Sequence, residues 1–526
     1  MIYDLLNITV SPEDAVNKEN LRLIAARKLR ISPIKISDIL IVKKSIDARQ
    51  REIKVILSLK IGVGESISPK SIYKYSYQYG DVSSAPSVIV VGAGPAGLFA
   101  ALRLIELGFR PIVIERGKSV SERKKDIALM NRNQGLNTES NYSFGEGGAG
   151  TFSDGKLYTR SKKKGSIRRI LEIFHLFGAQ DEILYEAHPH IGTDRLPIII
   201  KNMREKIIAC GGEVRFETKM VELLIQDNFV RGILLENGEK ILSSSVILAT
   251  GHSARDVYQM LYTKNIALEA KGFAMGVRVE HPQVLIDSIQ YHSKQRNKYL
   301  PAASYSLVAQ SDGRGVYSFC MCPGGHIVPA STEEGGIVVN GMSASHRGGK
   351  LANSGIVVEI QPEDISDYME KYGVMGGLKF QQYVENLAFL NNGGGKDLKA
   401  PAQRLKDFVE GRLSDSLPET TYLPGIISSP MHFWLPEQIS SRLRDGFRQF
   451  NRKMRGFLTN EAIVVGVESR SSSPLRIPRN RETFQHISLD GFYPCGEGAG
   501  YAGGITSSAM DGEACAEAIA KKCYNK

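Results

Sequence analysis

Cysteine is scarce in this chain and never occurs as C-x-x-C. Six cysteines among 526 residues are too few for the disulfide framework of a secreted protein, so we expect a reducing compartment, by default the cytoplasm. The missing C-x-x-C argues against a thioredoxin-reductase or glutathione-reductase mechanism. No apolar run reaches the roughly 20 residues that a membrane span needs. The first twenty residues contain early acids and no basic region before an apolar stretch, so no secretory signal is predicted.

The composition is that of a soluble globular protein, with 42% hydrophobic and 23% charged residues, and the length allows two or three domains. The net charge of +11 would suit a nucleic acid, an anionic lipid or an acidic substrate. The excess is spread along the chain except for the run at residues 160–169, RSKKKGSIRR. We interpret that run as solvated surface, with an anion-binding loop as the alternative.

A buried β-branched run at Ser87–Val91 leads directly into a G-x-G-x-x-G sequence. In such a motif Gly92 would make the tight turn, Gly94 would let a pyrophosphate approach the backbone, and Gly97 would let the next helix pack closely. That helix is predicted over Leu98–Leu107, and its N-terminus would offer free N–H groups to phosphates.

A second strand and an acid complete this pattern. The strand is predicted at Pro111–Ile114, and Glu115 follows it, 18 residues after Gly97. This is near the spacing expected of a carboxylate that binds ribose hydroxyls. The sequence therefore predicts a dinucleotide site. Its expected contacts also include Pro95, Ala96 and Arg116.

Residues 1–80 are expected to form a small separate α+β unit. Strands are predicted at Ile2–Val10, Ile39–Ile46 and Glu52–Ile61, with a helix at Glu19–Leu29, which gives a βαββ module. Its basic excess allows an RNA-binding role, but no aromatic platform accompanies the charge. A packing or assembly role is therefore favoured.

A second glycine-rich sequence occurs at Gly145–Gly150, but no apolar strand precedes it and no helical pattern follows. We interpret it as a loop that passes close to a bound cofactor, with a plain surface loop as the alternative. The residues expected to contact the cofactor here are Gly147, Gly148, Thr151, Ser153 and Asp154.

Six longer stretches together resemble a known family: Gly145–Arg160, Val277–Gln283, Ser318–Gly325, Val339–Ser343, Val467–Pro478 and Tyr493–Gly504. The chain resembles the poorly characterised bacterial FAD-dependent dehydrogenases, which are NAD(P)/FAD-dependent oxidoreductases of the glutathione-reductase-like flavoprotein superfamily. The resemblance implies an α/β fold, with a glutathione-reductase-like FAD-binding Rossmann domain, an inserted α+β substrate domain and the small N-terminal βαββ domain. The implied boundaries are 1–80 for the N-terminal domain, 86–270 and 461–526 for the two parts of the FAD-binding domain, and 271–460 for the substrate domain.

The same resemblance implies further FAD contacts. The segment Ser245–Gly251 would return beneath FAD, Met220 would lie beside the adenine, and Gly491–Ala520 would carry the second FAD motif. There Glu497 stands where the superfamily usually has Asp, and the N-terminus of the following helix would face the pyrimidine edge of the flavin. The contacts implied by these segments are Met220, Ala249, Thr250, Gly251, Gly496, Glu497, Gly503, Gly504 and Ile505.

Catalytic residues are harder to predict because hydride passes to a flavin ring without a protein nucleophile. The candidates are His281, Cys320, Cys322 and Arg470. For each of them a structural role is the alternative: a packed histidine, structural cysteines or an ion pair. No metal site is predicted, since His188 and His190 have no further ligands at metal spacing.

The predicted function is an FAD-dependent oxidoreductase that transfers a hydride between FAD and a small organic substrate. NAD(P)H is a candidate transient partner, because no second complete dinucleotide fold is visible in the sequence. One alternative is an RNA-modifying flavoprotein that uses the basic N-terminal module. Another is a non-catalytic scaffold with an FAD fold. We expect a small-molecule substrate, no nucleic acid and no membrane span, and the oligomeric state stays open.

Overall fold

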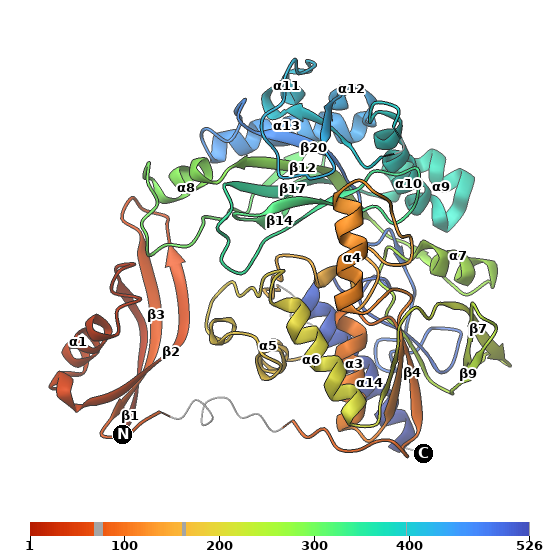
Figure 1. Ribbon diagram of the computed structural model, residues 1–526, viewed down its shortest axis with the longest axis horizontal. Coiled ribbons are helices and arrows are strands. Elements are labelled where there is room, and N and C mark those ends of the chain that lie inside the picture. The colour runs from red at the N-terminus through yellow and green to blue at the C-terminus, as the bar shows by residue number, and fades with distance from the viewer. Residues whose placement is uncertain (68–76, 160–164, 396, 525–526) are drawn as a thin grey trace.

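The computed structural model describes residues 1–67, 77–159, 165–395 and 397–524 (Figure 1). The first half of the basic run, residues 160–164, lies outside these ranges. The sequence also predicts a linker at residues 73–86, and its first part, residues 73–76, lies outside them as well. The fold is mixed α/β, with an N-terminal module on one side, a parallel sheet with its helices in the middle and a larger sheet above them. No helix of the described ranges is long and apolar enough to cross a bilayer.

The N-terminal module is a three-stranded antiparallel sheet of order β1-β3-β2 with one helix. Its elements are β1 (Ile2–Val10), α1 (Lys18–Leu29), β2 (Ile36–Asp47) and β3 (Lys54–Val63). The Asn17 side chain begins α1 by accepting hydrogen bonds from the N–H groups of Glu19 and Asn20 at 3.0 and 3.2 Å.

This module packs against the rest of the chain through β2 and the β2–β3 turn. Ile46, Ala48 and Ile53 pack on the hydrophobic core of the larger sheet. The backbone N–H of Lys44 donates to the carbonyl of Tyr185 at 2.8 Å.

The central sheet has five parallel strands in the order β22-β10-β4-β5-β6. These are β4 (Ser87–Val91), β5 (Arg110–Ile114), β6 (Glu213–Arg215), β10 (Val246–Leu248) and β22 (Phe492–Pro494). Because alternate side chains of a strand point to opposite faces, Val88 and Val90 pack on one core while Ile89 and Val91 pack on another. The C-terminal strand β22 thus lies in the same sheet as the first glycine-rich motif.

Helices cover one face of this sheet and a small meander covers the other (Figure 1). The helices are α3 (Pro95–Glu106), α5 (Ile167–Leu176), α6 (Leu196–Ala209) and α14 (Ile505–Tyr524); on the other face are β7 (Met220–Gln226), β8 (Phe229–Leu235), β9 (Lys240–Leu242) and α7 (Arg255–Thr263). Glycine at position 512 lets α14 approach α3, since a Cβ there would lie 2.0 Å from the carbonyl oxygen of Ala96.

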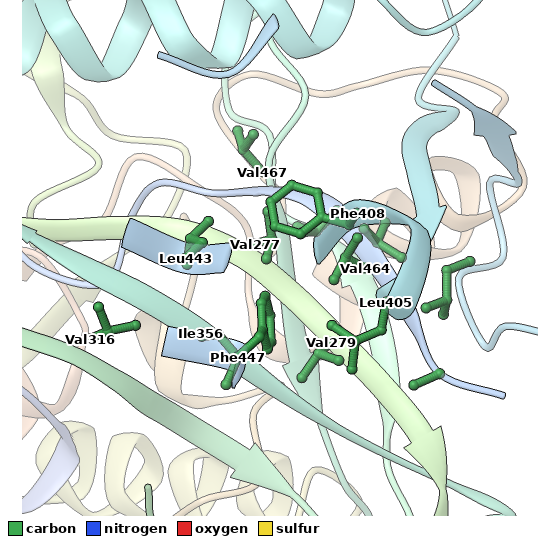
Figure 2. Packing of buried hydrophobic residues seen from close by; sticks show 14 of the residues in the cluster. Val277, Val279, Val316, Ile356, Leu405, Phe408, Leu443, Phe447, Val464 and Val467 are labelled. Atoms are coloured by element: carbon green, nitrogen blue, oxygen red, sulfur yellow. The ribbon is translucent and has the colours of Figure 1, made fainter. Parts of the chain in front are cut away.

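The larger sheet has seven strands in the order β13-β14-β17-β12-β20-β18-β19. They are β12 (Phe273–Pro282), β13 (Val308–Ser311), β14 (Arg314–Cys322), β17 (Leu351–Ile360), β18 (Ala400–Arg404), β19 (Ile426–Ser428) and β20 (Ile463–Glu468). Phe408 of α11 (Leu405–Glu410) and Phe447 of α13 (Glu437–Lys453) pack beside the valines of β12 and β20 (Figure 2). These helices cover one face of the seven-stranded sheet, and the sheet lies over the parallel sheet and its helices (Figure 1).

The remaining elements surround these sheets. They are α4 (Val120–Asn131), β11 (Glu269–Ala270), α8 (Gln283–Tyr291), β15 (His326–Pro329), β16 (Val339–Met342), α9 (Ser366–Tyr372), α10 (Gly376–Leu390), α12 (Met431–Trp434) and β21 (Leu475–Arg476), together with short 3₁₀ turns.

Strand β20 has a consequence for the domain boundary expected at residue 461. It pairs with β12 and β18 and so belongs to the seven-stranded sheet. We therefore propose that the second part of the FAD-binding domain begins after Glu468. The long strand β17, which pairs with both β12 and β14, lies in a region where the sequence pattern predicts no strand.

Candidate functional site

A cavity of about 360 Å³ lies at the carboxyl ends of β4, β5, β10 and β22, beneath the seven-stranded sheet. In open parallel α/β sheets ligands bind at this edge. The predicted cofactor residues that line the cavity are Gly92, Gly94, Pro95, Ala96, Glu115, Arg116, Gly148, Ser153, Asp154, Met220, Ala249, Thr250, Gly251, Glu497, Gly503, Gly504 and Ile505. The other four, Gly97, Gly147, Thr151 and Gly496, lie behind this lining.

The three glycines of the first motif have different surroundings. A Cβ on Gly97 would lie 1.9 Å from the carbonyl oxygen of Gly92, and one on Gly92 would lie 2.5 Å from that of Ala249. At Gly94, in contrast, the nearest protein atom to such a Cβ would be the Cα of Gly148, 3.9 Å away. The space beside Gly94 therefore belongs to the cavity, and a group as wide as a pyrophosphate fits this open backbone.

The second glycine-rich loop lies directly against the first motif. The N–H of Gly147 donates to the carbonyl of Ala93 at 2.8 Å, and a Cβ on Gly148 would lie 3.2 Å from the Cα of Gly94. Thr151 turns inward and donates to the carbonyl of Glu146 at 2.9 Å. The loop thus forms one wall of the cavity through Gly148, and Thr151 supports that wall from behind.

Glu115 is buried and holds three backbone segments together. Its Oε2 accepts from the N–H of Ala93 at 2.9 Å, and its Oε1 accepts from the N–H groups of Gly117 and Gly145, both at 3.0 Å. A carboxylate has about four acceptor positions, so one remains on Oε2. The acid can bind a ligand hydroxyl, but it also fixes the fold of both glycine-rich segments.

Arg123 of α4 supports the cavity wall from within the core, which the sequence pattern does not reveal. It is fully buried, and its guanidinium donates to the carbonyls of Asn141, Tyr142 and Glu146 at 2.7 to 2.8 Å. Burial lowers the pKa of Arg123 to about 10, which leaves it charged at neutral pH. This arginine shapes the second glycine-rich loop from behind.

The N-terminus of α14 and the turn before it form the wall opposite the first motif. Glu497 lies there with its Oε1 3.5 Å from Nδ1 of His252, while Nε2 of His252 donates to the carbonyl of Arg470 at 2.9 Å. Burial raises the pKa of Glu497, although the His252 ring opposes the shift. Gly496 is held from behind by Asp511, whose carboxylate accepts its N–H at 2.7 Å.

The seven-stranded sheet and the hairpin β15–β16 close the cavity from above. The lining residues from this side are Phe319, Cys320, Asn340, Gly341, Arg470 and Ser471. Two of the predicted catalytic candidates, Cys320 and Arg470, are therefore in the cavity wall.

Arg470 is held in place by a buried carboxylate. Its Nε and Nη2 donate to Glu385 of α10 at 3.2 and 3.0 Å, and Arg255 of α7 donates to the same carboxylate at 2.8 and 2.9 Å. Burial alone would raise the pKa of Glu385, but the two arginines outweigh it and hold that pKa well below its ordinary value. Arg470 therefore forms an ion pair, which is the structural role that the sequence analysis gives as its alternative.

Asp154 is also already paired. Its Oδ1 accepts from the hydroxyl of Ser343 at 2.6 Å, and its Oδ2 accepts from Arg347 at 2.6 Å. Burial opposes its charge, but Lys156 and Arg347 outweigh that effect and lower the pKa of Asp154. Asp154 is thus a charged, fixed part of the wall, with Lys156 beside it in the lining.

His281 and Cys322 lie outside the lining. The ring of His281 is buried against Phe457, with centroids 4.4 Å apart, and its Nε2 donates to the carbonyl of Phe457 at 2.8 Å. Burial lowers the pKa of His281 to about 4. We therefore assign His281 to the core and do not propose it as a catalytic base. Cys322 lies directly behind Cys320 in β14.

One group of metal-type ligands occurs in the described ranges, at Cys495, Asp511 and Cys515, whose ligand atoms lie within 4.8 Å of one another. Arg479 occupies this place, because its guanidinium donates to Asp511 at 3.0 Å and to the sulfur of Cys515 at 3.6 Å. With a fixed cation already present, we propose no metal ion there.

Comparisons with known sequences identify related families. Residues 272–471 match the family described as FAD-dependent protein, C-terminal domain-like, residues 86–139 match an FAD binding domain, and residues 1–62 match a domain of unknown function. An uncharacterised protein of Clostridium beijerinckii is 41% identical over 99% of both chains. The thiamine thiazole synthase of Aeropyrum pernix is 26% identical over 28% of this chain and 43% of its own length.

The solved structures that this chain matches include a geranylgeranyl bacteriochlorophyll reductase-like protein of Thermoplasma acidophilum and a flavin-dependent brominase. Each is 12% identical to this chain, covers 84% of it and 79% of its own length, and has a TM-score of 0.36.

Proposed function

The chain belongs to the family of FAD-dependent proteins that includes its full-length clostridial relative, and on that premise we propose that it transfers a hydride between FAD and a small organic substrate. It is a flavoprotein of the oxidoreductase type. The observation that carries the proposal is the single cavity that joins the open backbone at Gly94, the N-terminus of α14 and the wall from the seven-stranded sheet.

We propose that the ADP half of FAD binds along β4 and β5. The pyrophosphate would lie beside Gly94, where the N-terminus of α3 presents unpaired N–H groups and the positive end of its dipole. The remaining acceptor position of Glu115 would take a ribose hydroxyl. Met220, in the wall at the start of β7, would contact the adenine.

The flavin half would lie between Gly503–Ile505 and the strand end at Cys320. When bound, FAD supplies a two-electron acceptor and donor for hydride. The α14 N-terminus would stabilise negative charge on that ring system, and Arg470, fixed by Glu385, would border the substrate space. The order of the parallel strands, the meander β7–β9 before β10 and the terminal helix support a glutathione-reductase-like arrangement of this domain.

NAD(P)H is proposed only as a transient partner. The described ranges contain one parallel sheet with a glycine-rich turn, and we assign that turn to FAD. Because no second dinucleotide fold is present in these ranges, a nicotinamide cofactor would have to enter the cavity that holds FAD. Two electron sources are therefore compatible with the site, NAD(P)H or an organic substrate that reduces the flavin directly.

An anaerobic titration of the purified protein with NADH and then NADPH, followed in the visible flavin band, tests this function. Bleaching by either donor would support a nicotinamide-linked reductase. A bound flavin that neither donor bleaches would exclude NAD(P)H as the partner, and organic donors would then be titrated. If the protein showed no flavin band and did not bind added FAD, the proposed site would be wrong.

A further inference from the structure

Two cysteines lie at an irregularity in β14, at the cavity wall. The pairing register between β14 and β17 shifts between Phe319 and Cys322, and Cys320 within that shift has a φ of +47°. A non-glycine residue in this left-handed region is strained, and such residues occur preferentially at functional sites. This backbone presents Cys320 to the cavity while Cys322 stays fully buried behind it.

The two thiols are close and unequal. The Cys322 thiol donates to the carbonyl of Cys320 at 3.2 Å. Interaction with the Cys322 side chain lowers the pKa of Cys320 well below its ordinary value, and the charges of Lys156 and Arg278 act in the same direction. Interaction with Cys320 and burial raise the pKa of Cys322. Of the two thiols, the one at the cavity is therefore the more acidic.

Arg278 of β12 supports both cysteines from below. Its Nη2 donates to the carbonyl of Cys320 at 2.6 Å and lies 3.5 Å from the sulfur of Cys322, while Nη1 donates to Glu468 at 2.7 Å. Burial opposes the charge of Arg278, but Glu468 outweighs it and raises that pKa. Lys156 donates to the carbonyl of Met321, between the two cysteines. Such electropositive, partly accessible surroundings are typical of reactive cysteines.

We propose that Cys320 and Cys322 are a redox-active pair that exchanges two electrons with FAD bound in the cavity. In the oxidative direction an S–S bond forms between the Cys320 thiolate and the Cys322 sulfur. Two electrons and the proton of Cys322 pass to the oxidised flavin, so atoms and charge balance. In the reverse direction reduced flavin cleaves the disulfide. The pair would connect the flavin to a thiol or disulfide substrate at the cavity, by exchange through Cys320.

This inference rests on the proposed function, because it requires FAD in this cavity. The chain contains a second pair of neighbouring cysteines, Cys495 and Cys515, with sulfurs within 4.8 Å of each other, but both are fully buried. Cys523, at the exposed end of α14, provides a control for nonspecific oxidation.

The first experiment uses the flavin-free full chain, equilibrated in glutathione redox buffers of increasing oxidised fraction and then alkylated. Mass spectrometry of the peptides is expected to show loss of two hydrogens from the peptide that contains residues 320–322, with a defined midpoint. C320S and C322A should abolish that change, and C523S should leave it as in the wild type. If residues 320–322 remain fully alkylated at every ratio while the exposed Cys523 is modified, the proposal is wrong.

The second experiment is an anaerobic dithionite titration of the oxidised holoprotein. The wild type and C523S are expected to consume two two-electron equivalents, one for the flavin and one for the disulfide, and C320S only one. If the wild type and C320S consumed the same amount of dithionite, the proposed electron exchange between the cysteine pair and FAD would be wrong. The flavin band reports separately whether FAD is bound. If no variant, including the wild type, binds FAD, the proposed function fails, whereas the first experiment still reports on the thiols.

Discussion

The carboxylate of Glu385 and the guanidinium of Arg470 form a two-point ion pair, with N–O distances of 3.0 and 3.2 Å. Arg255 binds the same carboxylate from α7. One buried acid on α10 therefore fixes an arginine in the cavity wall and also joins the seven-stranded sheet to the domain that carries the glycine-rich motifs.

Glu385→Gln is expected to destabilise the whole protein because it removes the counter-charge that two buried arginines share, and only Arg255 keeps a second acid, Glu333 at 3.2 Å. Breaking such a pair costs about 3–5 kcal/mol, which denaturant unfolding of the flavin-free chain would measure. Because the folded state lowers the pKa of Glu385, its contribution is present above the ordinary glutamate pKa and is lost as the pH falls below it. The exposed Glu363→Gln should change stability by less than about 0.5 kcal/mol. Equal stability of the two variants would contradict this role.

Gly94→Ala separates cofactor binding from folding. The φ of Gly94 is −76°, which alanine adopts freely, and a Cβ there meets no described protein atom closer than 3.9 Å. The flavin-free variant should therefore unfold at the wild-type denaturant concentration. If the pyrophosphate lies there, the Kd for FAD should rise at least about tenfold, or roughly 1.4 kcal/mol.

Gly97→Ala is the matched control for that variant. Its Cβ would lie 1.9 Å from the carbonyl oxygen of Gly92, so the backbone must shift and the protein should lose about 1–3 kcal/mol of stability even without FAD. If Gly94→Ala bound FAD as tightly as the wild type, the proposed pyrophosphate position would be wrong.

Glu115→Gln should weaken both the fold and FAD binding. A glutamine side chain has one acceptor oxygen, so at least one of the N–H groups of Ala93, Gly117 and Gly145 would lose its partner. Each such buried donor costs about 1–3 kcal/mol. Unfolding of the flavin-free variant measures this loss, with Glu205→Gln on the surface of α6 as the control. A variant of unchanged stability but weaker FAD binding would show that the ribose contact dominates.

The sequence predicts the first glycine-rich motif well because its strand, turn and helix are consecutive, and each has its own local pattern. The helix is predicted at Leu98–Leu107 and observed at Pro95–Glu106. The FAD cofactor follows from the same local signal together with the family resemblance, and the family comparisons confirm it.

The strand β17 is missed for a physical reason. It is buried on both faces and so lacks the alternation of polar and apolar residues that marks a half-exposed strand. It also contains Asn, Ser and Gly, which local propensity assigns to turns. Pairing with the distant strands β12 and β14 makes this segment extended.

Arg123 and Glu385 are missed because their roles depend on partners far along the chain. Arg123 binds carbonyls 18 to 23 residues away, and Glu385 binds arginines 85 and 130 residues away. In the sequence each resembles an ordinary charged residue of an amphipathic helix. A charged residue at a core-facing helical position is the one local signal available, and it does not identify the partner.

His281 is expected to make stability depend on pH below neutrality. Its folded-state pKa is about 4, below the ordinary 6.5, because burial disfavours the charged ring. Between these values the unfolded chain binds a proton that the folded chain does not. The contribution of His281 to the free energy of unfolding is therefore constant above pH 6.5 and falls as the pH drops toward 4, by up to about 3 kcal/mol.

His281→Gln keeps a donor for the carbonyl of Phe457 but does not titrate. Denaturant unfolding at a series of pH values should therefore give a shallower decline for His281→Gln than for the wild type, whereas exposed His346→Asn should follow the wild type. Parallel curves for all three proteins would show that His281 does not carry this dependence and that its pKa is not lowered in the folded state.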